Sequence, residues 1–115
     1  MKRVYVAGAY SANNVIDVLQ NIGRGEYYAA QLFKAGFAPF TPWHDKEFAI
    51  VLWDHSFTVK QFYDYSIAWL EVSDAMFLVP GWEKSAGTIA EIKIAEKMGI
   101  PIFKTIDEMV EMSDD

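Results

Sequence analysis

The fold is decided by one stretch of sequence, AMFLVPGWEKSAGTIAE at residues 75–91. Its first five residues form an apolar run, which is typical of a buried strand. A helical pattern follows from Thr88 to Met98, and Gly99 and Pro101 end it. The residues between the two patterns therefore form a glycine-containing loop at a helix N-terminus. Such loops present unpaired backbone N–H groups and the positive end of a helix dipole, which suits a phosphate or another anion.

Glu91 is the unusual residue of this stretch. At about 100° per residue it falls on the apolar side of the predicted helix, between Met98 and Ala95 in angle. A carboxylate there is costly unless the protein uses it, so one interpretation is a functional group. The other is a capping box, in which Thr88 caps the helix and Glu91 reaches back to its backbone N–H. The pattern leaves both interpretations open.

The composition predicts a single domain over residues 1–115 with a core of its own. Hydrophobic residues make up 52% of the chain, yet no apolar run approaches the roughly 20 residues of a membrane span. We therefore expect no membrane partner. The chain enters a strand pattern at Val4 without the features of a signal peptide, which predicts a cytoplasmic protein.

Charge and residue types also limit the partners. The net charge is −6 and no run of Lys or Arg occurs, which argues against duplex nucleic acid, because binding it depends on neutralising phosphates. Cysteine is absent, so disulfides and Cys-based zinc sites are excluded. His44 and His55 are the only histidines, and no further ligand type stands near them. We expect no metal site and no cofactor.

The rest of the chain alternates between strand and helix patterns. Strand patterns cover residues 3–7, 37–40, 75–79 and 100–103, and helical patterns cover residues 26–34, 46–53, 58–73, 88–98 and 105–112. Residues 13–22 could be a short helix or a loop, and we expect Gly23 and Gly25 to interrupt any helix there. Gly36 is a predicted helix stop, and Pro39 predicts an edge strand.

This alternation predicts an α/β fold with a parallel sheet of four or five strands and helices on both faces. Right-handed crossovers favour the strand order 2-1-3-4(-5). A crevice then opens between the C-terminal ends of strands 1 and 3. It is bordered by the loops at residues 8–10 and 80–87, with Glu91 at the base of the second loop.

Several residues at this crevice have two interpretations. The small residues Gly8 and Ala9 would let a ligand approach the backbone. Ser85 and Thr88 are either helix caps or anion ligands. Aromatic residues in the loops could stack on a nucleobase or belong to the core, namely Tyr10, Trp43 and Trp82. Asp64 could be a solvated acid near a helix start.

Three segments together resemble the nucleoside 2-deoxyribosyltransferase superfamily, especially its small phage and bacterial members and the 2′-deoxynucleoside 5′-monophosphate N-hydrolases. The segments are residues 5–10, 67–75 and 80–91, and the resemblance runs over residues 3–103. It implies a flavodoxin- or Rossmann-like three-layer α/β/α fold and cleavage of an N-glycosidic bond. It implies that Glu91 attacks the sugar and forms a covalent glycosyl-glutamate, with Tyr10 near it. It also implies homodimers or larger assemblies in which a neighbour completes the pocket.

The same resemblance assigns the remaining site residues. The family usually has aspartates at the places of Ser66 and Pro80, so the acid nearest to the first of these places, Asp64, is the predicted acid. The predicted substrate-binding residues are Gly8, Ala9, Trp43, Ser66, Gly81, Trp82, Ser85, Gly87 and Thr88. Hydrolysis and transfer both remain open, as do nucleoside and 5′-monophosphate substrates. The alternatives are a non-catalytic nucleotide-binding module and an oligomeric protein with Glu91 as a helix cap.

Overall fold

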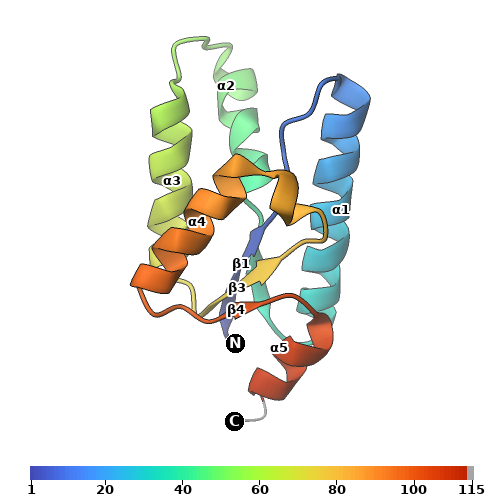
Figure 1. Cartoon of the computed structure of the whole chain (residues 1–115). Coiled ribbons are helices and arrows are strands. Elements are labelled where there is room, and N and C mark those ends of the chain that lie inside the picture. Colours follow the sequence, from blue (N-terminus) through green and yellow to red (C-terminus); the bar gives the residue numbers. More distant parts are fainter. Residues whose placement is uncertain (114–115) are drawn as a thin grey trace.

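The computed structural model describes residues 1–113, which form a parallel sheet with helices on both faces (Figure 1). The strands are β1 (Arg3–Ala7), β2 (Ala38–Phe40), β3 (Ala75–Leu78) and β4 (Ile102–Phe103). Their order in the sheet is β2-β1-β3-β4, and all three pairings are parallel. The predicted α/β fold and strand order are confirmed, with four strands among the described residues.

The helices are α1 (Val15–Lys34), α2 (Lys46–Leu52), α3 (Val59–Glu71), α4 (Ala86–Lys97) and α5 (Ile106–Ser113), with short 3-10 helices η1 (Pro42–Asp45) and η2 (Trp82–Lys84). Helices α1 and α5 cover one face of the sheet, and α3 and α4 cover the other (Figure 1). Within residues 1–113, no helix combines the length and the apolar character needed to cross a bilayer.

Alternation along the central strands divides the core into two clusters. Val4 and Val6 of β1 point to the α1 and α5 side, where they pack with residues such as Leu32 and Met109. Tyr5 and Ala7, two residues apart, point to the opposite side, where they pack with Leu70 of α3 and Ala95 of α4. Both strands β1 and β3 are buried on both faces, as expected for the centre of a parallel sheet.

Helix α1 corrects the expectation that the glycines at 23 and 25 would interrupt a helix. It runs without a break from Val15 to Lys34. A Cβ placed on Gly25 would lie 2.4 Å from the indole of Trp43, so this glycine makes room for a packed side chain. A Cβ on Gly23 would meet nothing within 4 Å. Packing therefore overrides the helix preference, which disfavours each glycine by about 1 kcal/mol relative to alanine.

Helix α4 begins earlier than the sequence pattern suggests, and this removes the capping box centred on Thr88. Ser85 is the N-cap, and its hydroxyl accepts a hydrogen bond from the backbone N–H of Thr88 at 3.2 Å. Glu91 consequently lies in the second turn of α4. It cannot cap the helix start, and its side chain is free for another contact.

Candidate functional site

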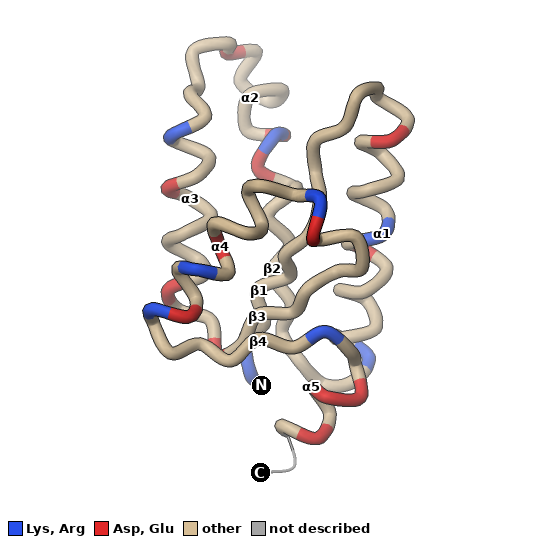
Figure 2. Tube along the Cα trace, in the orientation of Figure 1, with Lys and Arg blue, Asp and Glu red and all other residues tan. Residues whose placement is uncertain are grey.

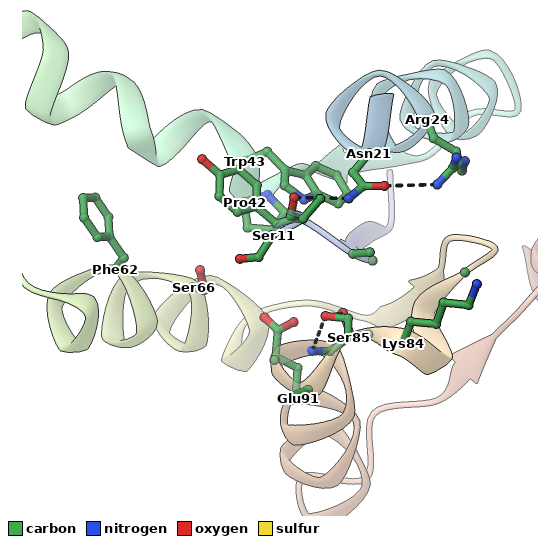
Figure 3. Close-up of a pocket in the computed structure, with 18 of the residues that line it drawn as sticks. Ser11, Asn21, Arg24, Pro42, Trp43, Phe62, Ser66, Lys84, Ser85 and Glu91 are labelled. Carbon is green, nitrogen blue, oxygen red and sulfur yellow. Dashed lines mark hydrogen bonds between the residues drawn. The ribbon is translucent and has the colours of Figure 1, made fainter. Parts of the chain in front are cut away.

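A cavity of about 1190 Å³ lies at the C-terminal ends of β1 and β3. This is where the doubly wound topology predicts a crevice. One wall is formed by the start of α4 and one side of α3, which cover the same face of the sheet, and the opposite wall consists of η1, the start of α2 and part of α1. Figure 3 shows Glu91 and Ser66 pointing into the cavity from α4 and α3, with Arg24 and Lys84 at its far end.

Glu91 is held by a buried side chain at the floor of the cavity. The hydroxyl of Tyr5, on β1, donates a short hydrogen bond to the Glu91 carboxylate. Ser66 of α3 acts on the same hydroxyl and lowers the pKa of Tyr5 to a smaller extent than burial and Glu91 raise it. Tyr5 is completely buried, so the orientation of the carboxylate is fixed by a residue that is part of the sheet. The inward angle predicted for Glu91 is the one the structure has.

The environment shifts the acidity of both groups. Burial raises the pKa of the Glu91 carboxyl, and the hydrogen bond from Tyr5 partly offsets this rise by favouring the ionised form. Burial and the nearby Glu91 charge raise the pKa of Tyr5 far above its usual range. Tyr5 therefore stays protonated as a donor. Glu91 is a partly desolvated carboxylate, a state in which it is more reactive than in water.

Most of the predicted site residues line this cavity. They come from the loop after β1, from η1, from α3 and from the β3–α4 connection: Gly8, Ala9, Tyr10, Trp43, Ser66, Gly81, Ser85, Gly87, Thr88 and Glu91. Two of them also have a structural task. A Cβ on Gly8 would lie 2.8 Å from the Cβ of Val79, so a glycine is needed there for strand contact. Trp43 is only 3% exposed and fills the space above Gly25.

Asp64 and Trp82 do not line the cavity. Asp64 has a 58% exposed side chain and forms an i,i+4 ion pair with Lys60, with Nζ and Oδ2 2.6 Å apart. The interpretation as a solvated helix acid is therefore the one that agrees with the structure, and the predicted acid role lacks a geometric basis. Trp82 packs against the α3–α4 core cluster, and Lys104 lies over its ring at 5.4 Å.

The tyrosine in contact with the carboxylate is Tyr5, whereas the sequence comparison pointed to Tyr10. Tyr10 lines the cavity but is 36% exposed, and its pKa is raised by partial burial and then by the charge of Asp45. The strand pattern contained part of this information, because alternate residues of a strand share a face and Tyr5 therefore lies on the same face as Ala7. That α4 covers this face is a feature of the tertiary structure.

Several further residues of the cavity were not predicted from the sequence, and four of them bear on its chemistry. Asp45 lies at the end of η1, Phe62 lies on α3, Arg24 lies on α1, and Lys84 lies in η2. Arg24 was missed because the helix was expected to break around it. Burial raises the pKa of the Asp45 carboxyl, and the backbone and side chain of Lys46 lower it to a smaller extent.

The far end of the cavity is suited to an anion. Ser85 caps α4 and accepts hydrogen bonds from both the backbone N–H and the hydroxyl of Thr88, which leaves its own O–H as a donor. Gly87 has open space beside it, because a Cβ there would come no closer than 4.0 Å to Ser85.

Over the described part of the chain, no three His, Asp or Glu side chains are grouped as a metal ion requires.

Comparison with known proteins gives a family and a fold. The family model "Domain of unknown function (DUF4406)" matches residues 2–104. No curated protein matches the chain. Among solved structures, it is similar to a 2-deoxyribosyltransferase of the psychrotolerant bacterium Bacillus psychrosaccharolyticus, with 16% identity and a TM-score of 0.61. The match covers 94% of this chain and 79% of the other. At this identity, the similarity shows the shared fold.

Proposed function

This chain belongs to the DUF4406 family, and we propose that it cleaves or transfers the N-glycosidic bond of a 2′-deoxynucleoside or its 5′-monophosphate. The observation that carries the proposal is the Glu91 carboxylate, which is half-buried, aimed into a large cavity and held by Tyr5. The similar fold of a 2-deoxyribosyltransferase supports it. A half-buried carboxylate lowers the stability of the fold, so a purely structural protein has no reason to retain one.

In the proposed reaction Glu91 attacks C1′ of the sugar. The bond from carboxylate oxygen to C1′ forms as the bond from C1′ to the base nitrogen breaks, which gives a covalent glycosyl-glutamate. Tyr5 orients the attacking oxygen and, by its hydrogen bond, keeps part of the carboxyl population ionised. Water or a second base then attacks the same carbon and frees Glu91, so hydrolysis and transfer share the first step.

The far end of the cavity favours a 5′-monophosphate over a free nucleoside. Arg24 lies next to Gly81, because a Cβ built on that glycine would be 3.9 Å from the Arg24 Nη1. The same Nη1 donates a hydrogen bond to the neutral amide oxygen of Asn21 at 3.3 Å. Lys84 extends into the same end (Figure 3). In the described residues neither cation is paired with a carboxylate. Two free cations beside the N-terminus of α4 form a suitable environment for a phosphate.

The opposite end of the cavity suits a nucleobase. Phe62 points into the space from α3, and Tyr63 and Tyr10 are two further aromatic residues of the cavity lining. Aromatic faces of this kind stack on any base, so they position the substrate without selecting one. The sugar would lie between the two ends, over the loop after β1 and next to Glu91.

The test is to incubate the protein with a panel of deoxynucleosides and their 5′-monophosphates and to measure the released base by chromatography. Adding a second free base distinguishes transfer from hydrolysis. We expect Glu91→Gln to lower the rate by at least roughly 10³-fold while the nucleotide still binds. Glu96→Gln, on the exposed side of α4, is the matched control. If the wild type binds monophosphates but releases no base at high protein concentration, the chain is a binding module and the catalytic proposal is wrong.

The phosphate preference has its own test. We expect Arg24→Gln combined with Lys84→Gln to raise KM for the monophosphate by about 10- to 100-fold, because each charge-assisted contact is lost, and to leave KM for the nucleoside unchanged. Equal effects on both substrates would rule out a phosphate contact.

We also propose that the chain forms a homodimer through the end of α2 and the start of α3. This segment contains apolar side chains with little cover, including Val51 at 72% exposure, Trp53 at 90% and Val59 at 86%. After Lys46 and Glu47, α2 carries no charge (Figure 2). Val59 also lines the cavity, so a second copy on this surface would border the cavity mouth. Exposed apolar groups that are contiguous and uncharged mark protein contacts.

Sedimentation measures this assembly. We expect a wild-type mass near twice the 13.1 kDa of the chain, and a shift toward monomer in a Trp53→Ser, Val59→Ser double variant. Phe33→Ser, at a 65% exposed position of α1, should leave the mass unchanged. A monomeric wild type at micromolar concentration would contradict the proposal.

A further inference from the structure

We propose that Asp45 is the acid that protonates the leaving base. The inference rests on the proposed function and names a second catalytic group for it. Among the described residues, the carboxyl groups that line the cavity are those of Asp17, Asp45 and Glu91. A proton donor to the base has to come from the walls of the cavity, and Asp64, the acid that the sequence suggested, lies outside it.

Asp17 is a poor candidate for this role. It lies in the first turn of α1, is exposed, and its Oδ2 accepts a hydrogen bond from Nδ2 of Asn14 at 3.0 Å. Its carboxylate belongs to the hydrogen-bonded start of α1 and is open to solvent. The N-capping cluster of α1 therefore accounts for Asp17.

The position of Asp45 is the opposite. It ends η1, directly after β2, whereas Glu91 lies on α4, directly after β3. Because the sheet order is β2-β1-β3, these carboxyls reach the cavity from opposite sides of the end of β1. The charge of Asp45 acts on both Tyr5, which holds Glu91, and Tyr10 on the β1 loop. A sugar lying over this loop would have Glu91 on one side and Asp45 on the other, where the base projects.

The groups around Asp45 leave it available for a proton. Lys46 donates its Nζ to the backbone oxygen of Trp43 at 2.9 Å, and the Nε2 of His44 lies 3.7 Å from Glu26. Lys46 and His44 thus contact other groups, and within residues 1–113 no ion pair includes Asp45. These two residues and the backbone N–H groups of Asp45 and Lys46 lower the pKa of the carboxyl by less than burial raises it. Tyr5 and Tyr10 are neutral neighbours. Partial burial without a paired cation favours the protonated carboxyl.

The assigned step balances as follows. As the Glu91 oxygen bonds to C1′, the electron pair of the C1′–N bond moves to the base, and the Asp45 proton moves to a ring nitrogen or the carbonyl oxygen of that base. The base leaves neutral, and Asp45 becomes a carboxylate. It then takes a proton from the water that attacks C1′, which restores both carboxyls.

The test compares the best substrate of the panel with an analogue whose base leaves without protonation, an N7-methylated purine or a 5-fluorinated pyrimidine. We expect Asp45→Asn to lower kcat for the parent substrate by about 10²- to 10⁴-fold and for the analogue by less than about 10-fold. The fall in rate at alkaline pH should disappear with the analogue. Glu47→Gln, at an exposed carboxyl two residues from Asp45 and outside the cavity lining, is the control and should behave as wild type with both substrates.

Two further variants keep the outcome decisive. Glu91→Gln should be inactive with both substrates. An inactive wild type would be a different result, because it would refute the proposed function as a whole. Asp45→Glu should retain a measurable rate with both substrates and the alkaline limb of the pH–rate profile. This variant separates loss of the carboxyl from loss of structure. If Asp45→Asn loses the same factor with both substrates, or loses nothing with either, Asp45 is not the acid.

Discussion

The two walls of the cavity are built differently. The α4 wall is anchored in the core: Ala95 is fully buried, Thr88 is 1% exposed, and the helix start is capped by Ser85. The opposite wall contains α2, which has no buried residue, and Trp53, which ends α2 with a positive φ and 90% exposure. The nucleophile candidate therefore lies on a helix with buried residues, whereas the proposed acid, Asp45, ends η1 next to a helix with none.

Among the variants that test this comparison, the largest expected effect concerns the way Glu91 is held on α4. Tyr5→Phe removes the hydrogen bond to the carboxylate, and we expect kcat to fall by about 10²-fold. This bond lowers the pKa of Glu91, so its loss should move the acid limb of the pH–rate profile to higher pH. Kinetics over a pH range measures both. An acid limb that stays in place would mean that Tyr5 does not control the ionisation of Glu91.

The next effect concerns the attachment of the other wall. A Cβ on Gly25 would collide with the Trp43 indole at 2.4 Å, and η1 would have to shift. We expect Gly25→Ala to cost about 1–3 kcal/mol of unfolding free energy. Gly23→Ala, in the same helix with open space around it, should instead stabilise by up to about 1 kcal/mol. Urea denaturation of the pair checks both signs, and equal values would show that Trp43 does not secure this wall.

A smaller effect follows from the burial of Glu91. Its pKa is raised in the folded chain above the ordinary 4.5, so between these two values the native state binds more protons than the unfolded state. Stability should therefore fall as the pH rises through this window. Glu91→Gln removes the titration, and we expect its Tm to exceed that of the wild type at pH 7 by roughly 4 °C for each kcal/mol regained. The difference should disappear below pH 4.5, as thermal melts at several pH values can show.

The smallest effect is expected outside the cavity. Asp64→Asn breaks an exposed i,i+4 pair with Lys60, which is worth less than about 0.5 kcal/mol. We expect Tm and kcat to remain near their wild-type values, in contrast to Asp45→Asn. A large loss of activity in Asp64→Asn would reverse the assignment of the acid.

Local patterns predicted much of the fold and part of the site. The apolar runs at β1 and β3 located the buried strands, and the angle of Glu91 relative to Ala95 located the inward carboxylate. Contacts distant in the sequence were not predictable in this way. The contact between Gly25 and Trp43, which keeps α1 continuous, joins residues from two elements, and no local pattern contains it.

By itself, the sequence determined the parallel sheet, its strand order and the side of α4 on which Glu91 lies, because hydrophobic periodicity and right-handed crossovers act within short segments. Only the tertiary structure decided which tyrosine holds Glu91, that Asp64 faces solvent, and that Asp45, Arg24 and Lys84 border the same cavity. These choices depend on how separate helices and loops meet over the ends of two strands, and packing across the sheet fixes that geometry.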